Sequence, residues 1–144
     1  MAAILVSIVI ILPWLGALAV WLAGNRQPRL QHTFAVSFSV LTALASLILL
    51  AFAGSEAVIR IPLGASFGEL TFVPDGLAVS LTAIAAVIGS LAVVFSVDYM
   101  HGDDQLGRYY FLVLFFIGAM IGLVLSGNLL FTFFFWEITA LCSY

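Results

Sequence analysis

The sequence begins with an uninterrupted apolar run, residues 2–23, and comparable runs follow at residues 32–53, 77–97 and 109–126. At a rise of about 1.5 Å per residue, a helix over such a run crosses a hydrocarbon core of about 30 Å. A further apolar run begins at residue 128. Because 65% of the residues are hydrophobic and 8% are charged, nothing is left over for a soluble domain. The pattern predicts an all-α fold, a polytopic transmembrane helical bundle of about five helices.

The first apolar run has a competing interpretation as a secretory signal peptide. A signal peptide carries basic residues ahead of its apolar core. Here no basic residue precedes the run, and Arg26 and Arg29 follow it. These flanks favour a retained transmembrane anchor.

The arginines between the apolar runs predict the orientation in the membrane. The turn after the first run holds Arg26 and Arg29, and the link after the third run ends on Arg108. The loop after the second run has Arg60, but it also holds two glutamates. Because short loops rich in arginine stay on the cytoplasmic side, this distribution predicts that the N-terminus lies outside.

Residues 54–74 interrupt the hydrophobic pattern and would form a short extracytoplasmic loop. Glycines and Pro62 alternate there with short β-branched and aromatic runs, which is typical of a small β-hairpin. Asp75 and Gly76 then precede the third apolar run. A carboxylate in this position can accept hydrogen bonds from the free N–H groups at a helix start, so we predict that Asp75 is a helix cap.

Small residues within the runs predict where helices pack closely. Gly118, Gly122 and Ser126 recur at four-residue spacing, which gives the fourth helix a flat strip that another helix can approach. One face of the second helix carries hydroxyl groups. A proton wire along them is one use; packing, with bonds back to the helix's own carbonyls, is the interpretation we favour. These residues are Ser39, Thr42 and Ser46.

The remaining polar residues offer little chemistry. His101 lies beside Asp103 and Asp104, but a solvated loop explains this group better than a metal site, and we expect no metal. Cys142 is the single cysteine and is interpreted as a small apolar core residue. A net charge of -3 without any lysine indicates neither a nucleic-acid partner nor a basic lipid-binding patch. Without a nucleophile paired with a base, or a cofactor motif, an intramembrane enzyme is a weak hypothesis, and we expect no cofactor in this chain.

Residues 126–144 carry one acid, Glu137, inside an otherwise uncharged apolar run. Inserting an ionisable group at membrane depth costs about 2.5–3.5 kcal/mol of free energy, so such a group normally has a function. Glu137 is therefore the candidate catalytic residue, as an intramembrane proton relay. The alternative is an acid kept only for packing. On a helical wheel, bulky apolar residues surround Glu137 and small polar residues lie opposite, so we expect this helix to be buried within a bundle.

A set of short motifs in the second half of the chain identifies a related family. The motifs are Asp75-Gly76-Leu77, Tyr99-Met100, Arg108 through Phe111, Met120, Leu123 through Ser126, Asn128-Leu129-Leu130, Trp136-Glu137 and Leu141 through Tyr144. The Trp-Glu pair after an Asn-Leu-Leu helix start is the most specific of them. Together they resemble the antiporter-like proton-translocating subunits shared by respiratory complex I, Mrp-type sodium/proton antiporters and membrane-bound hydrogenases.

The resemblance implies a role for Glu137, and it implies either a larger protein or a split gene. In the family, the matching glutamate lies on the fifth helix and works with a lysine on a later helix. No lysine is present here to take that part. The family core consists of paired inverted repeats. Residues 1–126 would then form the N-terminal transmembrane region, and residues 127–144 the truncated start of the proton-conducting core.

Two functions follow as expectations. In the first, the chain is part of a membrane subunit that translocates protons, or exchanges cations such as sodium for protons. That subunit has no redox chemistry of its own. The alternative is a non-transporting scaffold subunit that only assembles partners. Either function places the chain in a cell membrane or an organelle inner membrane, with the lipid bilayer and other membrane subunits as its partners. The two differ in whether ion flux needs Glu137.

Overall fold

The computed structural model describes residues 2–24, 27–52, 58–62, 68–100 and 105–144. Four helices are long and apolar enough to cross a membrane, and a fifth apolar helix is shorter. The all-α transmembrane bundle predicted from the sequence is confirmed. In chain order, the elements are α1 (Ala2–Ala23), α2 (Pro28–Leu50), β1 (Ile59–Pro62), β2 (Glu69–Phe72), α3 (Gly76–Tyr99), α4 (Leu106–Leu125) and α5 (Leu129–Ser143).

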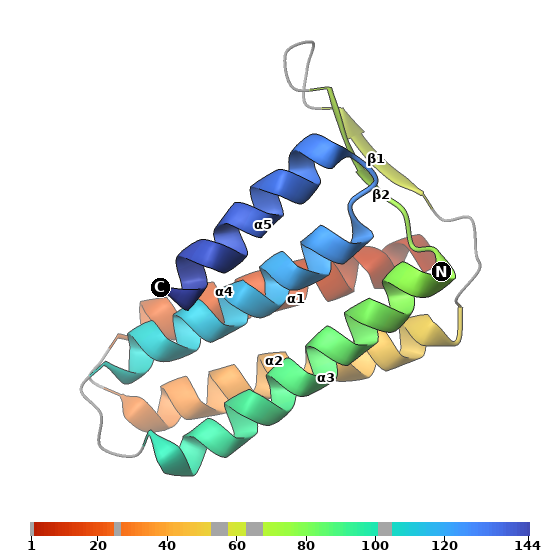
Figure 1. The fold of residues 1–144 in the computed structure, drawn as a ribbon. Helices are drawn as coiled ribbons and strands as arrows, with labels where there is room; N and C mark the ends of the chain where they lie inside the picture. Colours follow the sequence, from red (N-terminus) through yellow and green to blue (C-terminus); the bar gives the residue numbers. More distant parts are fainter. Residues whose placement is uncertain (1, 25–26, 53–57, 63–67, 101–104) are drawn as a thin grey trace.

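Helices α1 to α4 form an antiparallel bundle, and α5 lies on its outer side (Figure 1). α1 packs against both α2 and α4, α2 packs against α3, and α3 packs against α4, so these four helices close around one core. α5 packs against α4. The end of α1 and the start of α2 lie at one end of the bundle, together with the end of α3 and the start of α4 (Figure 1). The start of α1 and the paired strands β1 and β2 lie at the other end (Figure 1).

The first helix begins and ends where the apolar run predicts, but α2 begins at Pro28 rather than at residue 32. Proline suits the first helical position because its missing N–H has no partner there and its φ angle is already set. Gln31 then lies buried in the first turn, where its Nε2 donates to the Gly24 carbonyl at 3.1 Å. This hydrogen bond lets a polar residue enter the helix, although the hydrophobic pattern predicts a loop there.

The hairpin predicted within residues 54–74 forms from β1 and β2. The two strands pair antiparallel, with Ile59 opposite Phe72 and Pro62 opposite Glu69. The other edge of β2 meets the turn between α4 and α5, through a bridge between Phe72 and Ser126. The hairpin is therefore attached to the start of α5.

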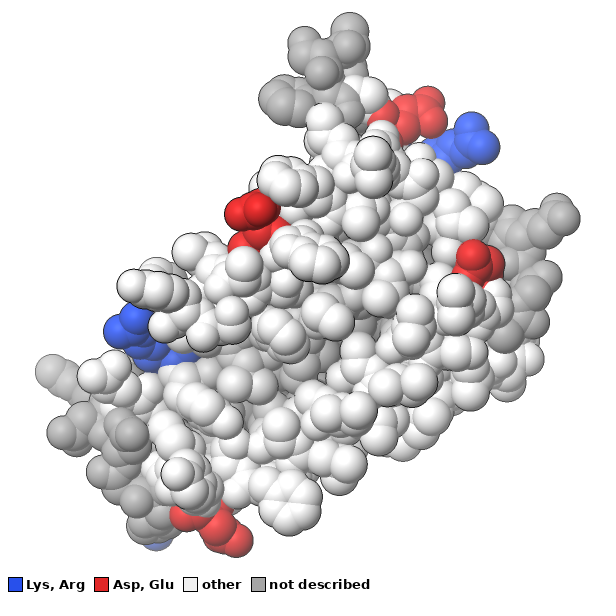
Figure 2. Space-filling view, viewed as in Figure 1, with Lys and Arg blue, Asp and Glu red and all other residues white. Residues whose placement is uncertain are grey.

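The described arginines separate along the bundle. Arg29 and Arg108 lie in the first turns of α2 and α4, at the end of the bundle away from the hairpin, whereas Arg60 lies in β1. Arg26 is outside the described residues. Between the ends, the face seen in Figure 2 is largely uncharged. The side of the membrane on which each end lies, with the N-terminus outside, stays a prediction.

The hydroxyl face of α2 is buried against its neighbours. Each of its three hydroxyls donates to a carbonyl three or four residues earlier in the same helix, at 2.7–3.1 Å. Because every one of these groups is bonded within α2, the face serves helix packing. The residues are Ser39, Thr42 and Ser46.

Two tyrosines near the start of α4 join three helices. The Tyr110 side chain is fully buried, and its hydroxyl lies 2.8 Å from Nδ1 of His32 on α2. The Tyr109 hydroxyl lies 2.6 Å from Oγ of Ser96 on α3. These hydrogen bonds thus fix the positions of α2, α3 and α4 relative to one another along the bundle axis at this end.

Replacing Tyr110 with phenylalanine is expected to lower the free energy of unfolding by about 0.6–2 kcal/mol, the range for hydrogen bonds between membrane helices. The ring is retained, so the core keeps its packing and only the bond to His32 is lost. Denaturant titration in detergent micelles measures the change. Tyr99→Phe is the control, because Tyr99 is 88% exposed. Equal midpoints for the two variants would contradict a stabilising role for the Tyr110 bond.

Candidate functional site

The helix that carries Glu137 starts from a side-chain cap. Asn128 precedes α5 with an extended backbone, and its Oδ1 accepts a hydrogen bond from the N–H of Leu130 at 2.9 Å. Asparagine is among the best residues for this position, because its short side chain satisfies an N–H that the helix leaves free. The apolar run that follows then continues as helix through Ser143.

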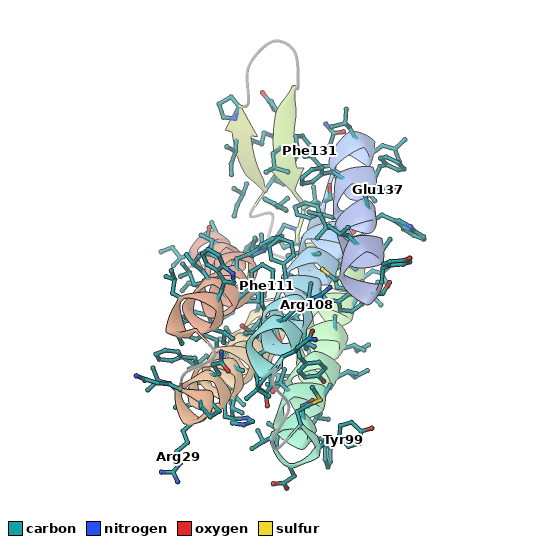
Figure 3. All side chains as sticks on the ribbon, turned by 90° about the vertical axis from the view of Figure 1, so that its left-hand side faces the viewer. Arg29, Tyr99, Arg108, Phe111, Phe131 and Glu137 are labelled. Carbon is teal, nitrogen blue, oxygen red and sulfur yellow. The ribbon has the colours of Figure 1, made fainter. Side chains whose placement is uncertain are left out.

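Glu137 lies about 12 Å along α5 from Leu129, at about 1.5 Å per residue. Its side chain is exposed, and Figure 3 shows it on α5 in the half of the molecule that also holds the hairpin. Within the described part of the chain, no hydrogen bond or ion pair to the Glu137 carboxylate is formed. The carboxylate is therefore available to a group beyond these residues.

The expectation that this helix is buried within a bundle is wrong for the described chain. Phe135 is the one buried residue of α5, since the helix packs against α4 with a single narrow face. A groove of about 770 Å³, with Thr132, Phe133 and Trp136 among its lining residues, follows the outer face. The large apolar residues that remain exposed on α5 are Leu129, Leu130, Phe133, Phe134, Trp136 and Leu141.

The predicted glycine strip on α4 faces two different helices. A Cβ atom at Gly118 would lie 2.7 Å from Nε1 of Trp14 on α1. A Cβ atom at Gly122 would lie 2.6 Å from Cε1 of Phe135 on α5. Ser126 follows the end of α4, so it takes part in the bridge to Phe72 instead of in the strip. Gly122 thus provides the space that lets α5 approach α4.

Asp75 stands at the start of α3 with an extended backbone, and its Oδ1 accepts a hydrogen bond from the N–H of Ala78 at 2.6 Å. This is the geometry of a helix cap. The carboxylate is thereby engaged in holding the end of a helix. Asp75 belongs to the architecture around the site, and it begins α3, which also packs against α4.

Among the described residues, the other candidates contribute no second site. His101, Asp103 and Asp104 lie outside the described residues. Among the residues that are described, no group of three or more potential ligands could hold a metal ion. Cys142 is a free, half-buried thiol near the end of α5 rather than a core residue.

A groove of about 410 Å³ between α3 and α4 also lacks proton chemistry. Its walls, with Ile88, Gly89 and Phe116 among them, are formed by aliphatic, aromatic, glycine and methionine residues. Such a groove accommodates hydrocarbon and offers no group that binds a proton. This groove therefore offers no alternative to Glu137 as a proton-binding group.

Sequence reasoning missed the contacts that hold α5 in place. Asn128 is part of a family motif, and the motif does not predict its capping geometry, although an asparagine directly before an apolar run is a helix-start signal. The ring of Phe135 meets Phe72 of the hairpin, with ring centroids 6.3 Å apart. No sequence pattern links these two residues, because they come from elements separated by α3 and α4.

Comparisons with known proteins find similarity over part of the chain. Residues 62–110 match the family model described as NADH-Ubiquinone oxidoreductase (complex I), chain 5 N-terminus. Over 70 residues, the chain is 43% identical to Na(+)/H(+) antiporter subunit A1 of Staphylococcus haemolyticus (strain JCSC1435). It is 41% identical over 70 residues to the protein of the same name from Staphylococcus aureus (strain bovine RF122 / ET3-1).

The similarity covers a limited part of each protein. The matched 70 residues are 49% of this chain and 9% of the Staphylococcus haemolyticus protein, so the chain spans a small fraction of its relatives' length. Over the matched segments, both comparisons agree with the resemblance to antiporter-like subunits that the sequence motifs indicate. The four helices that are long and apolar enough to cross a membrane agree with a multi-pass membrane protein.

Proposed function

We propose, on the premise that this chain represents the N-terminal part of an antiporter-like subunit, that it belongs to a proton-translocating or cation/proton-exchanging membrane subunit. Glu137 acts in it as an intramembrane proton relay. The chain performs no redox chemistry of its own, and any redox centres of the parent complex lie on other subunits. The transported ion is the proton, with sodium as a second candidate for the exchanged cation.

The observation that carries the proposal is an acid on an apolar helix face. Glu137 is exposed on α5 between large apolar residues, and a relay needs a carboxylate that can take up and release a proton. A carboxylate in such surroundings costs free energy, and packing alone gives no reason to keep it. The matched family residues, 62–110, do not include Glu137, so its role rests on this geometry and on the Trp136-Glu137 motif.

A scaffold subunit is the second candidate, and one observation favours it. The close approaches at Gly118 and Gly122 show helices built to pack tightly, which an assembly role also requires. A scaffold, however, has no use for the charge of Glu137. Flux of protons and of sodium in sealed vesicles that contain the parent complex, with and without Glu137→Gln, decides between the two.

Residues 1–144 alone are expected to move no protons. A relay must pass its proton to a second group, and the described residues supply no hydrogen-bond or ion-pair partner for Glu137. The sequence also holds no lysine. A further segment or a partner chain would supply the base that exchanges the proton with Glu137. Reconstituting residues 1–144 in liposomes under an imposed pH gradient measures this flux.

Empty vesicles are the control for that experiment. Proton flux above the empty-vesicle level, and abolished by Glu137→Gln, would contradict the need for a second group. Flux that survives Glu137→Gln would instead indicate leakage through a loosely packed bundle.

A further inference from the structure

The hairpin and the α4–α5 turn form one sheet-like unit. β2 pairs with β1 along one edge and meets residues 125–127 along the other. On that second edge, the N–H of Val73 donates to the Leu125 carbonyl and the N–H of Gly127 donates to the Thr71 carbonyl, both at 2.8 Å. The backbone between α4 and α5 is therefore held by a strand that precedes α3 in the chain.

Asn128 extends this unit into α5 with two different hydrogen bonds. While its Oδ1 caps the helix through the N–H of Leu130, its Nδ2 donates to the Glu69 carbonyl on β2 at 3.3 Å. The Asn128 carbonyl also accepts from the N–H of Thr132 at 2.9 Å, in the first turn of the helix. Aspartate or serine can cap a helix, but neither has an amide N–H₂ group for the Glu69 carbonyl. The asparagine side chain thus joins the start of α5 to the hairpin.

Phe72 and Phe135 form a second attachment. Phe72 is 4% exposed and Phe135 is 8% exposed, and their rings meet beside the space left by Gly122. At about 100° per residue, Glu137 lies about 200° around the helix from Phe135. Holding Phe135 inward therefore directs Glu137 outward, away from α4.

We propose that the hairpin is a clasp that positions Glu137, where the clasp is β1, β2, residues 125–128 and Phe135. Asn128 sets the point at which α5 begins, and Phe72 sets how the helix is rotated. The inference rests on the proposed relay role of Glu137. Asn128 and Phe72 are positioning residues, because they act on Glu137 through α5. Because α4 is the main helix contact of α5, loss of the clasp lets α5 pivot about Gly122.

The test uses the full-length protein in its native complex. Spin labels on cysteines at Leu91 of α3 and Leu141 of α5, in a Cys142→Ser background, report the position of α5 as a distance distribution. Asn128→Asp keeps the cap and loses the donor to the Glu69 carbonyl, whereas Asn128→Ala loses both. We expect a broader distance distribution for both variants. Ion flux should fall roughly tenfold, since misplacing a reacting group by about 1 Å can cost that much or more.

Asp75→Ala is the matched control for the distance measurement. It removes a helix cap of similar strength from α3, so the protein loses comparable stability while the clasp stays intact. The distance distribution between α3 and α5 should then keep its width. A distribution that broadens as much as in Asn128→Ala would show that general loss of stability, and not the clasp, moves α5, and the inference would be overturned.

The remaining outcomes also decide the inference. Unchanged distances in both Asn128 variants would overturn the clasp, and broader distances with normal flux would overturn its positioning role. If Asn128→Ala does not assemble, Asn128→Asp and Phe72→Leu carry the same measurement. Combining Asn128→Ala with Glu137→Gln should be no slower than Glu137→Gln alone. If Glu137→Gln itself transports normally, the proposed function fails, while the distances still decide whether the clasp exists.

Discussion

Glu137→Gln is expected to reduce proton or cation flux about a hundredfold or more, with the complex still assembled at its normal level. Positioned groups that transfer protons typically contribute about 100-fold to 10,000-fold to a rate. Glutamine keeps the size of the side chain and its capacity for hydrogen bonds, and it loses only the ability to ionise. Flux in sealed membrane vesicles, normalised to the amount of complex, measures the effect.

Glu69→Gln is the matched control, because it makes the same chemical change on an exposed hairpin residue. It should transport normally, since only the backbone carbonyl of Glu69 engages Asn128. Alanine at position 137 is a poorer test because it also removes side-chain volume. Normal flux by Glu137→Gln at wild-type complex levels would remove Glu137 from the transport path and leave the scaffold function.

Gly122→Leu is expected to reduce the yield of assembled complex at least several-fold. A Cβ atom at this position already lies 2.6–2.8 Å from three ring atoms of Phe135, so a leucine side chain must displace the ring or separate α5 from α4. Overpacking of this kind costs about 1–3 kcal/mol. Size-exclusion chromatography of the detergent-solubilised complex measures the yield.

Two further variants give this prediction its control and its rescue. Gly76→Leu adds the same side chain where no atom lies within 4 Å of the added Cβ, so it should assemble normally. Adding Phe135→Ala to Gly122→Leu makes room for the leucine and should recover part of the yield. A normal yield for Gly122→Leu alone would show that the residues around Gly122 can move to accept the leucine. Gly122 would then not determine how closely α5 packs against α4.

The transmembrane helices could be predicted because an apolar run of sufficient length has few alternatives in a membrane. The bounds of α1 follow directly from residues 2–23. The start of α2 does not, because Gln31 enters the core only through a bond to the Gly24 carbonyl, which depends on the path of the preceding turn. Polar side chains at helix ends form hydrogen bonds with residues outside the helix. Hydrophobic periodicity does not predict those hydrogen bonds.

Glu137 can be singled out from the sequence as a candidate relay, but its surroundings could not be predicted. Glu137 stands out because it is the one acid in an apolar run. The direction in which it points depends on which face of α5 meets α4, and α5 carries bulky apolar residues on several sides. The choice is made by the fit of Phe135 over Gly122, a pairing of shapes between two helices. Such a fit depends on how the two helices pack, and the sequence pattern of either helix alone does not specify it.

The attachment of α5 to the hairpin has a consequence for how the chain folds. The hydrogen bond from Asn128 to Glu69 joins residues 59 positions apart in the sequence, and the intervening chain contains all of α3 and α4. As the chain is made, β2 can pair with β1 at once, but its second edge must wait until both intervening helices have entered the bilayer and turned back. Closure of a long loop is slow compared with local pairing. The register of α5 is therefore decided late, by helices already in place, and errors in inserting α3 or α4 would first appear as a misplaced α5.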